Sequence, residues 1–272
     1  MVVTDLDGTL FQRDHKMSPR NLRTLVELGR RGTLRVIATG RNLFSARKVL
    51  PPDFPVDFVL FSSGAGVMDW PAQRLIRSVS MSAEEVARAF RALATRRLDF
   101  MVQRPIPDNH YFLYYPAGGG NLDFEARKAV YAPFASAGDL AEPPTAACQL
   151  LAVEPPGRRP SAYEAVRAEL TGLTVLRSTS PLDHRSCWIE VFPAAASKSK
   201  AAAWLARERG VDPRGVLAVG NDYNDLDLLE WAGTSRLAAG APPELAARFP
   251  VAASRDDSDF AESVEAWERG DL

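Results

Sequence analysis

The first ten residues, MVVTDLDGTL (residues 1–10), place an acidic loop directly after the short apolar run Val2-Val3. A short apolar run that is bounded by turn-forming residues is typical of a buried strand. Asp and Gly favour the tight turn that must follow such a strand. The sequence therefore predicts a strand at Val2-Val3 that ends in a polar loop carrying the two carboxylates Asp5 and Asp7.

The same combination of an apolar run and a polar cluster recurs along the chain. Residues 34–38 precede Thr39-Gly40-Arg41, residues 58–61 precede Ser62-Ser63-Gly64, and residues 216–219 precede the cluster 220–225. Helical patterns lie between these runs; one is expected from Ser18, its N-cap, with Pro19 in the first helical position, and others at 42–50 and 197–209. Such alternation predicts an α/β fold with a Rossmann-like sheet of parallel strands, whose polar clusters meet at one edge.

The alternation stops between residues 81 and 186. Strand patterns at 100–103, 110–115 and 149–154 follow one another there, with prolines and the run Gly118-Gly119-Gly120 marking loops. We therefore expect an inserted α+β domain at 81–186, and a core domain made of residues 1–80 and 187–272.

Composition excludes several classes of protein. The chain has 272 residues, 46% of them hydrophobic, and a net charge of −1, so it is neither disordered nor strongly basic. No apolar stretch reaches the length of about 20 residues that spans a bilayer, and the two cysteines, Cys148 and Cys187, do not form a disulfide framework. We expect a cytoplasmic monomer without nucleic-acid or membrane partners.

The polar clusters supply groups for phosphate chemistry. Crowded carboxylates need a cation or protons to relieve their repulsion, and an all-oxygen ligand set suits Mg²⁺. Gly40, Thr9, Thr39 and Lys198 offer backbone, hydroxyl and ammonium donors to an anion. A metal beside a cradle of donors is what phosphoryl transfer requires. The predicted edge holds Asp5, Asp7, Thr9, Thr39, Lys198, Asn221, Asp222, Asn224 and Asp225.

The four clusters, in this order, resemble the four motifs of the haloacid dehalogenase-like hydrolases, and most closely those of the Cof-type and sucrose-phosphatase-like branch with a large inserted cap. The resemblance implies that Asp5 is the nucleophile that forms an aspartyl phosphate and that Asp7 is the acid/base. It further implies that Thr9, Thr39, Gly40, Lys198 and Asn224 hold the phosphoryl group. Lys198 fits the family's lysine position better than Lys200. Mg²⁺ would be bound by Asp5, by the Asp7 carbonyl and by the fourth motif.

The sequence departs from the family pattern in two places. Asn221 stands where the family carries an aspartate, so the metal ligand of the fourth motif is Asn221, Asp222 or Asp225. Ser63 stands where Cof-type relatives carry asparagine. Ser63, Arg41 and His110 are the candidate substrate contacts, although Arg41 is equally placed to begin a helix and His110 to be a packing residue.

The residues and the resemblance together predict a Mg²⁺-dependent phosphatase that acts on a small phosphorylated metabolite, with a sugar phosphate as the leading class. Two other functions remain open. A phosphomutase would use the same aspartyl phosphate and return the phosphoryl group to its substrate. A non-catalytic protein that binds a phosphorylated metabolite would account for Asn221, but the presence of both Asp5 and Asp7 argues against it.

Overall fold

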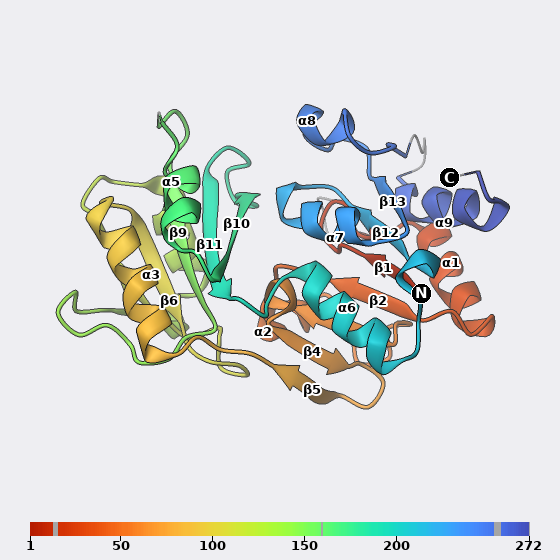
Figure 1. Cartoon of the computed structure of the whole chain (residues 1–272), viewed down its shortest axis with the longest axis horizontal. Helices are drawn as coiled ribbons and strands as arrows, with labels where there is room; N and C mark the ends of the chain where they lie inside the picture. Colours follow the sequence, from red (N-terminus) through yellow and green to blue (C-terminus); the bar gives the residue numbers. More distant parts are fainter. Residues whose placement is uncertain (13–15, 159, 253–256, 272) are drawn as a thin grey trace. The chain divides into compact units, whose positions relative to one another are not determined.

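The computed structural model describes residues 1–12, 16–158, 160–252 and 257–271. The chain divides into two compact units, one made of Met1–Arg77 with Ser197–Leu272 and the other of Ser78–Ala196. We call them the core unit and the inserted unit (Figure 1).

The described part of the core unit is built on a seven-stranded sheet with the order β13-β12-β1-β2-β3-β4-β5. The strands β13, β12, β1, β2 and β3 are parallel, and β4 is antiparallel to β3. This confirms the predicted parallel α/β core. The strands are β1 Val2–Thr4, β2 Arg35–Ala38, β3 Phe58–Phe61, β4 Gly66–Asp69, β5 Arg74–Ser78, β12 Leu217–Gly220 and β13 Thr234–Leu237.

Helices pack on both faces of this sheet. The side chains of α6 and α7 join Val3, Val36 and Ala218 in one apolar cluster, while α1 and α9 pack against each other and contact β2 and β12. The predicted start of α1 is confirmed, because Ser18 accepts a hydrogen bond from the Asn21 N–H and Pro19 is the first helical residue. The helices are α1 Pro19–Arg30, α2 Leu43–Ala46, α6 Lys198–Glu208, α7 Leu226–Trp231, α8 Pro243–Ala246 and α9 Asp259–Arg269.

The inserted unit has a sheet of its own, with the order β10-β11-β9-β6-β7-β8 in the described residues. Neighbouring strands of this sheet are antiparallel, except that β7 and β8 are parallel. Helices α3 and α5 bury one face of this sheet in an apolar cluster. The elements are β6 Asp99–Gln103, β7 Phe112–Tyr115, β8 Ala135–Ala137, β9 Gln149–Glu154, β10 Leu173–Thr179, β11 Cys187–Pro193, α3 Ala83–Thr95, α4 Leu122–Val130 and α5 Ala162–Glu169.

The boundary predicted at residue 187 is wrong by about one strand. The predicted boundary puts the apolar run 188–192 in the core domain, but this run lies in β11, which pairs with β9 and β10 of the inserted unit. An apolar strand carries no mark of the sheet that it joins, because its partners are distant in sequence. The chain returns to the core unit only at Ser197.

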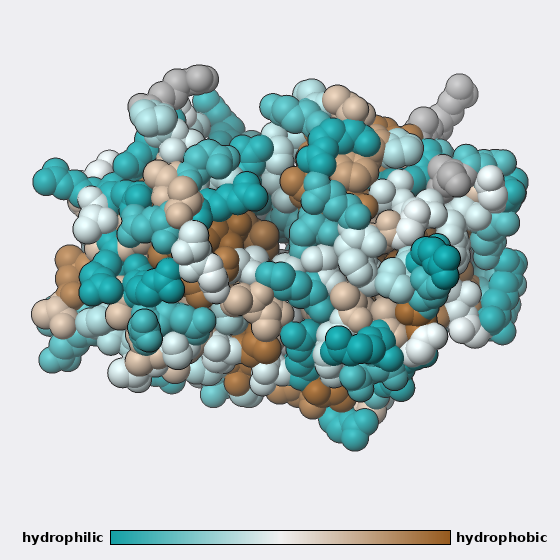
Figure 2. All heavy atoms as spheres, in the orientation of Figure 1, coloured by the Kyte–Doolittle hydropathy of each residue, from teal (hydrophilic) through white to brown (hydrophobic). Residues whose placement is uncertain are grey.

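The surface matches the composition. Hydrophilic side chains cover most of the face that Figure 2 shows, with hydrophobic residues scattered among them. Among the described residues, no helix combines the length and the apolar character that crossing a membrane requires.

Candidate active site

The loop after β1 is tightly constrained by its own backbone. The Asp5 N–H donates to the Val219 carbonyl of β12 at 2.8 Å, the Phe11 N–H to the Leu6 carbonyl at 2.8 Å, and the Gly8 N–H to the Phe11 carbonyl at 2.7 Å. Gly8 has a φ of +79°, which a residue without Cβ adopts at little cost. The loop therefore fixes Asp5 and Asp7 at the carboxyl end of β1, as predicted.

Lys198 links two of the predicted motifs. Its Nζ lies 2.5 Å from Asp5 Oδ1 and 2.5 Å from Asp225 Oδ1. The lysine side chain is completely buried, as is that of Asp225, and the Asp5 side chain is 7% exposed. Lys200, two residues further along α6, is exposed. The structure thus brings Asp5, Lys198 and Asp225 together in one buried cluster, which we call the lysine bridge.

The lysine bridge carries two carboxylates on a single ammonium group. Burial raises the pKa of Asp5 to about 8; the charge of Lys198 opposes this rise, and those of Asp225 and Asp7 add to it. Burial by itself would lower the pKa of Lys198, but Asp225 and Asp5 outweigh it, so the pKa is raised above its ordinary value. With both carboxylates ionised, one negative charge is left uncompensated in a buried place, where a cation is favoured.

The fourth cluster wraps around Asp225. Asp225 Oδ2 accepts the backbone N–H groups of Asn221 at 2.8 Å and Asp222 at 3.1 Å, while Oδ1 contacts Lys198. Both oxygens of Asp225 are therefore engaged by other groups of the protein, and its role as a metal ligand, like that of Asp222, stays a prediction. Gly220 is needed here because an added Cβ would lie 2.6 Å from Asp225 Cγ. Asp222 begins the 3₁₀ turn Tyr223–Asp225 and is half-buried.

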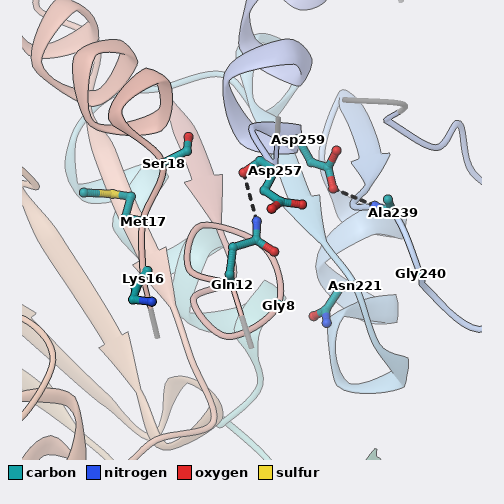
Figure 3. A pocket seen from close by; sticks show the side chains of 10 residues that line it. All are labelled: Gly8, Gln12, Lys16, Met17, Ser18, Asn221, Ala239, Gly240, Asp257 and Asp259. Atoms are coloured by element: carbon teal, nitrogen blue, oxygen red, sulfur yellow. Dashed lines mark hydrogen bonds between the residues drawn. The ribbon is translucent and has the colours of Figure 1, made fainter. Parts of the chain in front are cut away.

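Asn221 lies against the loop after β1. A Cβ added at Gly8 would be 2.5 Å from Asn221 Nδ2, so the side-chain amide sits directly beside the segment that follows Asp7. A cavity of about 510 Å³ opens at this point, and Asn221 and Gly8 line it together with Asp259 (Figure 3). Asp259 Oδ2 accepts the N–H of Ala239, another residue that lines the cavity, at 2.8 Å.

Predicted residues from the loops after β2, β3 and β12 gather around Gly40. A Cβ added at Gly40 would lie 3.6 Å from Asn224 Nδ2 and 3.8 Å from Ser63 Oγ. Thr39 is buried, and its Oγ1 accepts the Arg41 N–H at 3.1 Å. Ser63 is fully buried with a φ of +50°, and within the described residues its Oγ has no hydrogen-bond partner. A buried hydroxyl without a partner on a strained backbone is suited to a ligand.

Thr9 shows the same feature in the loop after β1. Its side chain is 1% exposed, and Oγ1 makes no hydrogen bond to any described residue. Burying a hydroxyl without a partner costs free energy. A phosphate oxygen would supply the missing acceptor.

The remaining candidates, Arg41 and His110, have well-defined surroundings. Arg41 forms a two-pronged ion pair with Asp7, with N–O distances of 2.6 and 2.7 Å. His110 belongs to the inserted unit, where its ring packs against Tyr111 and Phe134 with centroid distances of 4.4 and 4.9 Å. Burial lowers its pKa. That His110 contacts a substrate stays a prediction.

Sequence patterns missed two residues that hold the site in place. Asp227 Oδ2 accepts both the N–H and the hydroxyl of Ser199, at 3.1 and 2.5 Å, and so ties the start of α6 to α7. Gly64 has a φ of +86°, and a Cβ there would lie 2.3 Å from the Ser197 carbonyl oxygen. Both positions fix the N-terminus of α6 and hence Lys198. Neither has a sequence signal of its own, because each acts through a partner more than 25 residues away.

Several known phosphatases are similar to this chain in sequence or in fold. The chain is 24% identical over 260 residues to 5-amino-6-(5-phospho-D-ribitylamino)uracil phosphatase YwtE of Bacillus subtilis, covering 85% of each chain. The structure is similar to the phosphatase BT1666 of Bacteroides thetaiotaomicron, with a TM-score of 0.76, 21% identity and coverage of 98% and 94%. It is also similar to the subclass IIB sugar phosphatase BT4131, with a TM-score of 0.74, 15% identity and coverage of 100% and 99%.

A family model confirms the resemblance that the four sequence clusters indicated. The model described as haloacid dehalogenase-like hydrolase matches residues 2–259, which is nearly the whole chain. The match includes the loop after β1, the start of α6 and the fourth cluster. By its sequence and its fold, this chain belongs to the haloacid dehalogenase-like hydrolases.

Proposed function

We propose that the chain is a Mg²⁺-dependent phosphatase that hydrolyses a small phosphorylated metabolite through an aspartyl phosphate on Asp5. The observation that carries the proposal is the lysine bridge. Lys198 contacts one oxygen of Asp5 at 2.5 Å and leaves the other to attack a phosphoryl group. Lys198 also offsets the charge of the nucleophile, which keeps the anion tolerable in a buried site.

The chemistry divides into two transfers. Asp5 attacks phosphorus while the bond to the leaving oxygen breaks, and that oxygen takes the proton of Asp7. Asp7, now a carboxylate, removes a proton from a water molecule that attacks the aspartyl phosphate. The P–O bond to Asp5 then breaks, phosphate leaves, and Asp7 carries its proton again. We propose that the hydroxyls of Thr9 and Ser63, which are buried without a hydrogen-bond partner among the described residues, bind phosphoryl or substrate oxygens.

The donor set fits Mg²⁺. Asp5 and Asn221 offer side-chain oxygens and Asp7 a backbone carbonyl, and hard oxygen ligands are those that Mg²⁺ prefers. Within the described residues, no group of three His, Cys, Asp or Glu side chains forms a metal site, so the proposed set depends on the amide and the carbonyl. The uncompensated charge of the lysine bridge also favours a cation. When bound, Mg²⁺ would neutralise phosphoryl charge.

We propose that the substrate is a phosphorylated sugar or polyol. One relative is named for a phosphate on a ribityl chain and one structural neighbour is a sugar phosphatase. These names support a phosphorylated sugar or polyol as the substrate. Substrates of this kind present hydroxyl groups, which the Ser63 hydroxyl could accept or donate to.

The test is phosphate release from 4-nitrophenyl phosphate, with Mg²⁺ and with a chelator. Wild-type protein should release phosphate only with Mg²⁺, and Asp5→Asn should release none while still unfolding in a cooperative transition. Asp212→Asn, an exposed carboxylate paired with Arg214, is the matched control and should behave as wild type. Release by Asp5→Asn, or release that survives the chelator, would contradict the proposal.

A phosphomutase and a binding protein give different results in the same assay. A mutase would release little phosphate and would convert a sugar phosphate to its isomer when a bisphosphate is added. A binding protein would be stabilised by the metabolite without any turnover. Trapping of a phosphorylated Asp5 by mass spectrometry, followed by its loss with time, would distinguish the phosphatase from the binding protein.

A further inference from the structure

Arg41 holds both oxygens of Asp7. Its Nε donates to Asp7 Oδ2 at 2.7 Å and its Nη2 to Asp7 Oδ1 at 2.6 Å. The remaining Nη1 donates to the hydroxyl of Ser45 at 3.1 Å. This two-pronged pairing fixes the plane of the carboxylate as well as its position, which a single hydrogen bond does not.

The arginine is itself held from two sides. Its backbone N–H donates to Thr39 Oγ1 at 3.1 Å, and its carbonyl accepts the Ser62 N–H at 2.7 Å. Ser45 is fixed in turn because its N–H donates to Asn42 Oδ1, the N-cap of α2, at 2.8 Å. Arg41 is thus anchored to the loops after β2 and β3 and reaches across to the loop after β1.

This pair is only partly buried. The Asp7 side chain is 37% exposed and that of Arg41 is 19% exposed, so solvent screens the pair and limits what it contributes to stability. The core unit contains a second forked pair, whose side chains are less exposed than those of Arg41 and Asp7. Arg35 contacts Asp57 at 2.8 and 3.0 Å, with side chains only 16% and 26% exposed, at the opposite end of β2.

We infer that Arg41 is a positioning residue for Asp7, and the inference rests on the proposed function. As the proton of Asp7 passes to the leaving oxygen, the O–H bond of Asp7 breaks, an O–H bond forms on the leaving group, and the P–O bond to it breaks. The Asp7 oxygen that loses the proton then accepts the second N–H of Arg41. The fork stabilises the carboxylate as it forms, so its effect is greatest where proton donation matters most.

Leaving-group acidity separates this role from a contact with the phosphoryl group. Phenol is a poor leaving group and needs the proton, whereas 4-nitrophenol leaves readily as the anion. The test is therefore to measure kcat/KM for phenyl phosphate and 4-nitrophenyl phosphate in the presence of Mg²⁺. This parameter reports the first transfer, in which the phosphoryl group passes to Asp5. Arg41→Lys keeps the charge and removes the fork, and Arg35→Lys is the matched control.

We expect Arg41→Lys to slow the reaction of phenyl phosphate more than that of 4-nitrophenyl phosphate. Arg41→Lys should lower kcat/KM about 10- to 100-fold for phenyl phosphate and less than about threefold for 4-nitrophenyl phosphate, which is a part of the roughly 10²- to 10⁴-fold that general acid catalysis contributes. Arg35→Lys should leave the ratio of the two substrates unchanged. In an Asp7→Asn background, Arg41→Lys should cause no further selective loss, because its partner is already altered.

Other results would overturn the inference. An equal loss for both substrates would place Arg41 on the phosphoryl group or in the fold, and an unchanged ratio would leave it without a catalytic effect. A selective loss that persists in the Asp7→Asn background would show that Arg41 does not act through Asp7. If the wild type releases phosphate from neither compound, the proposed function fails, and the inference fails with it.

Discussion

Replacing Lys198 with methionine tests the lysine bridge directly. The substitution keeps most of the side-chain volume but leaves Asp5 and Asp225 without their shared counter-ion. Removing one partner of a buried ion pair costs about 3–5 kcal/mol. Because Lys198 is completely buried and contacts two carboxylates at 2.5 Å each, we expect the loss in unfolding free energy to reach about 5 kcal/mol. At about 2–4 °C per kcal/mol, Tm should fall by about 10–20 °C.

The assay is urea and thermal unfolding followed by tryptophan fluorescence, in the absence of divalent cations. Lys200→Met, which alters an exposed lysine of the same helix, is the matched control and should change Tm by little. Neutralising the partners should restore stability, so Lys198→Met combined with Asp5→Asn and Asp225→Asn should be more stable than Lys198→Met alone. The reasoning is refuted if Lys198→Met loses no more than Lys200→Met, or if the triple variant is no more stable than the single one.

Three further predictions concern the lysine bridge and the residues next to it. Mg²⁺ should raise the Tm of the wild type, and Asn221→Asp should lower the Mg²⁺ concentration that gives half of this rise, because an added charge strengthens a hard-cation site; an unchanged titration would count against Asn221 as a ligand. Burial raises the pKa of Asp5 to about 8, above about 3.9 in an unfolded chain, so the folded state binds the proton more tightly. Cation-free protein should therefore lose stability as the pH rises from about 4 to 8, and Asp5→Asn should lose less over that window; equal pH profiles would contradict this. Gly220→Ala should cost about 1–3 kcal/mol of unfolding free energy through overpacking against Asp225, while Gly215→Ala, where a Cβ meets open space, should cost far less by the same urea assay.

The sequence predicts the core unit well because its signals are local. Each parallel strand is a short apolar run, and each run ends in residues that favour loops. The parallel topology then requires those loops to share one edge. The start of α1 was predictable for the same reason, since Ser18 and Pro19 carry the capping pattern themselves.

The features that sequence reasoning did not find are long-range or conformational. The helix predicted at 42–50 is regular only over Leu43–Ala46, and the rest forms turns. Strand β11 joins the inserted sheet through partners that no local pattern reveals. The pairing of Arg41 with Asp7 crosses 34 residues, and the left-handed backbone of Ser63 belongs to a residue type that rarely adopts it.

The point at which the chain re-enters the core unit has an evolutionary consequence. Ser197 is both the first residue after the insertion and the N-cap of α6, so the next residue is already Lys198. The insertion begins after Arg77 and ends before this cap, so Asp5 lies before it, Lys198 and Asp225 lie after it, and all three belong to the core unit. A change in the length or sequence of the inserted unit therefore need not alter the hydrogen-bond network around Asp5. Selection can then act on the inserted unit and on the lysine bridge through separate stretches of the gene.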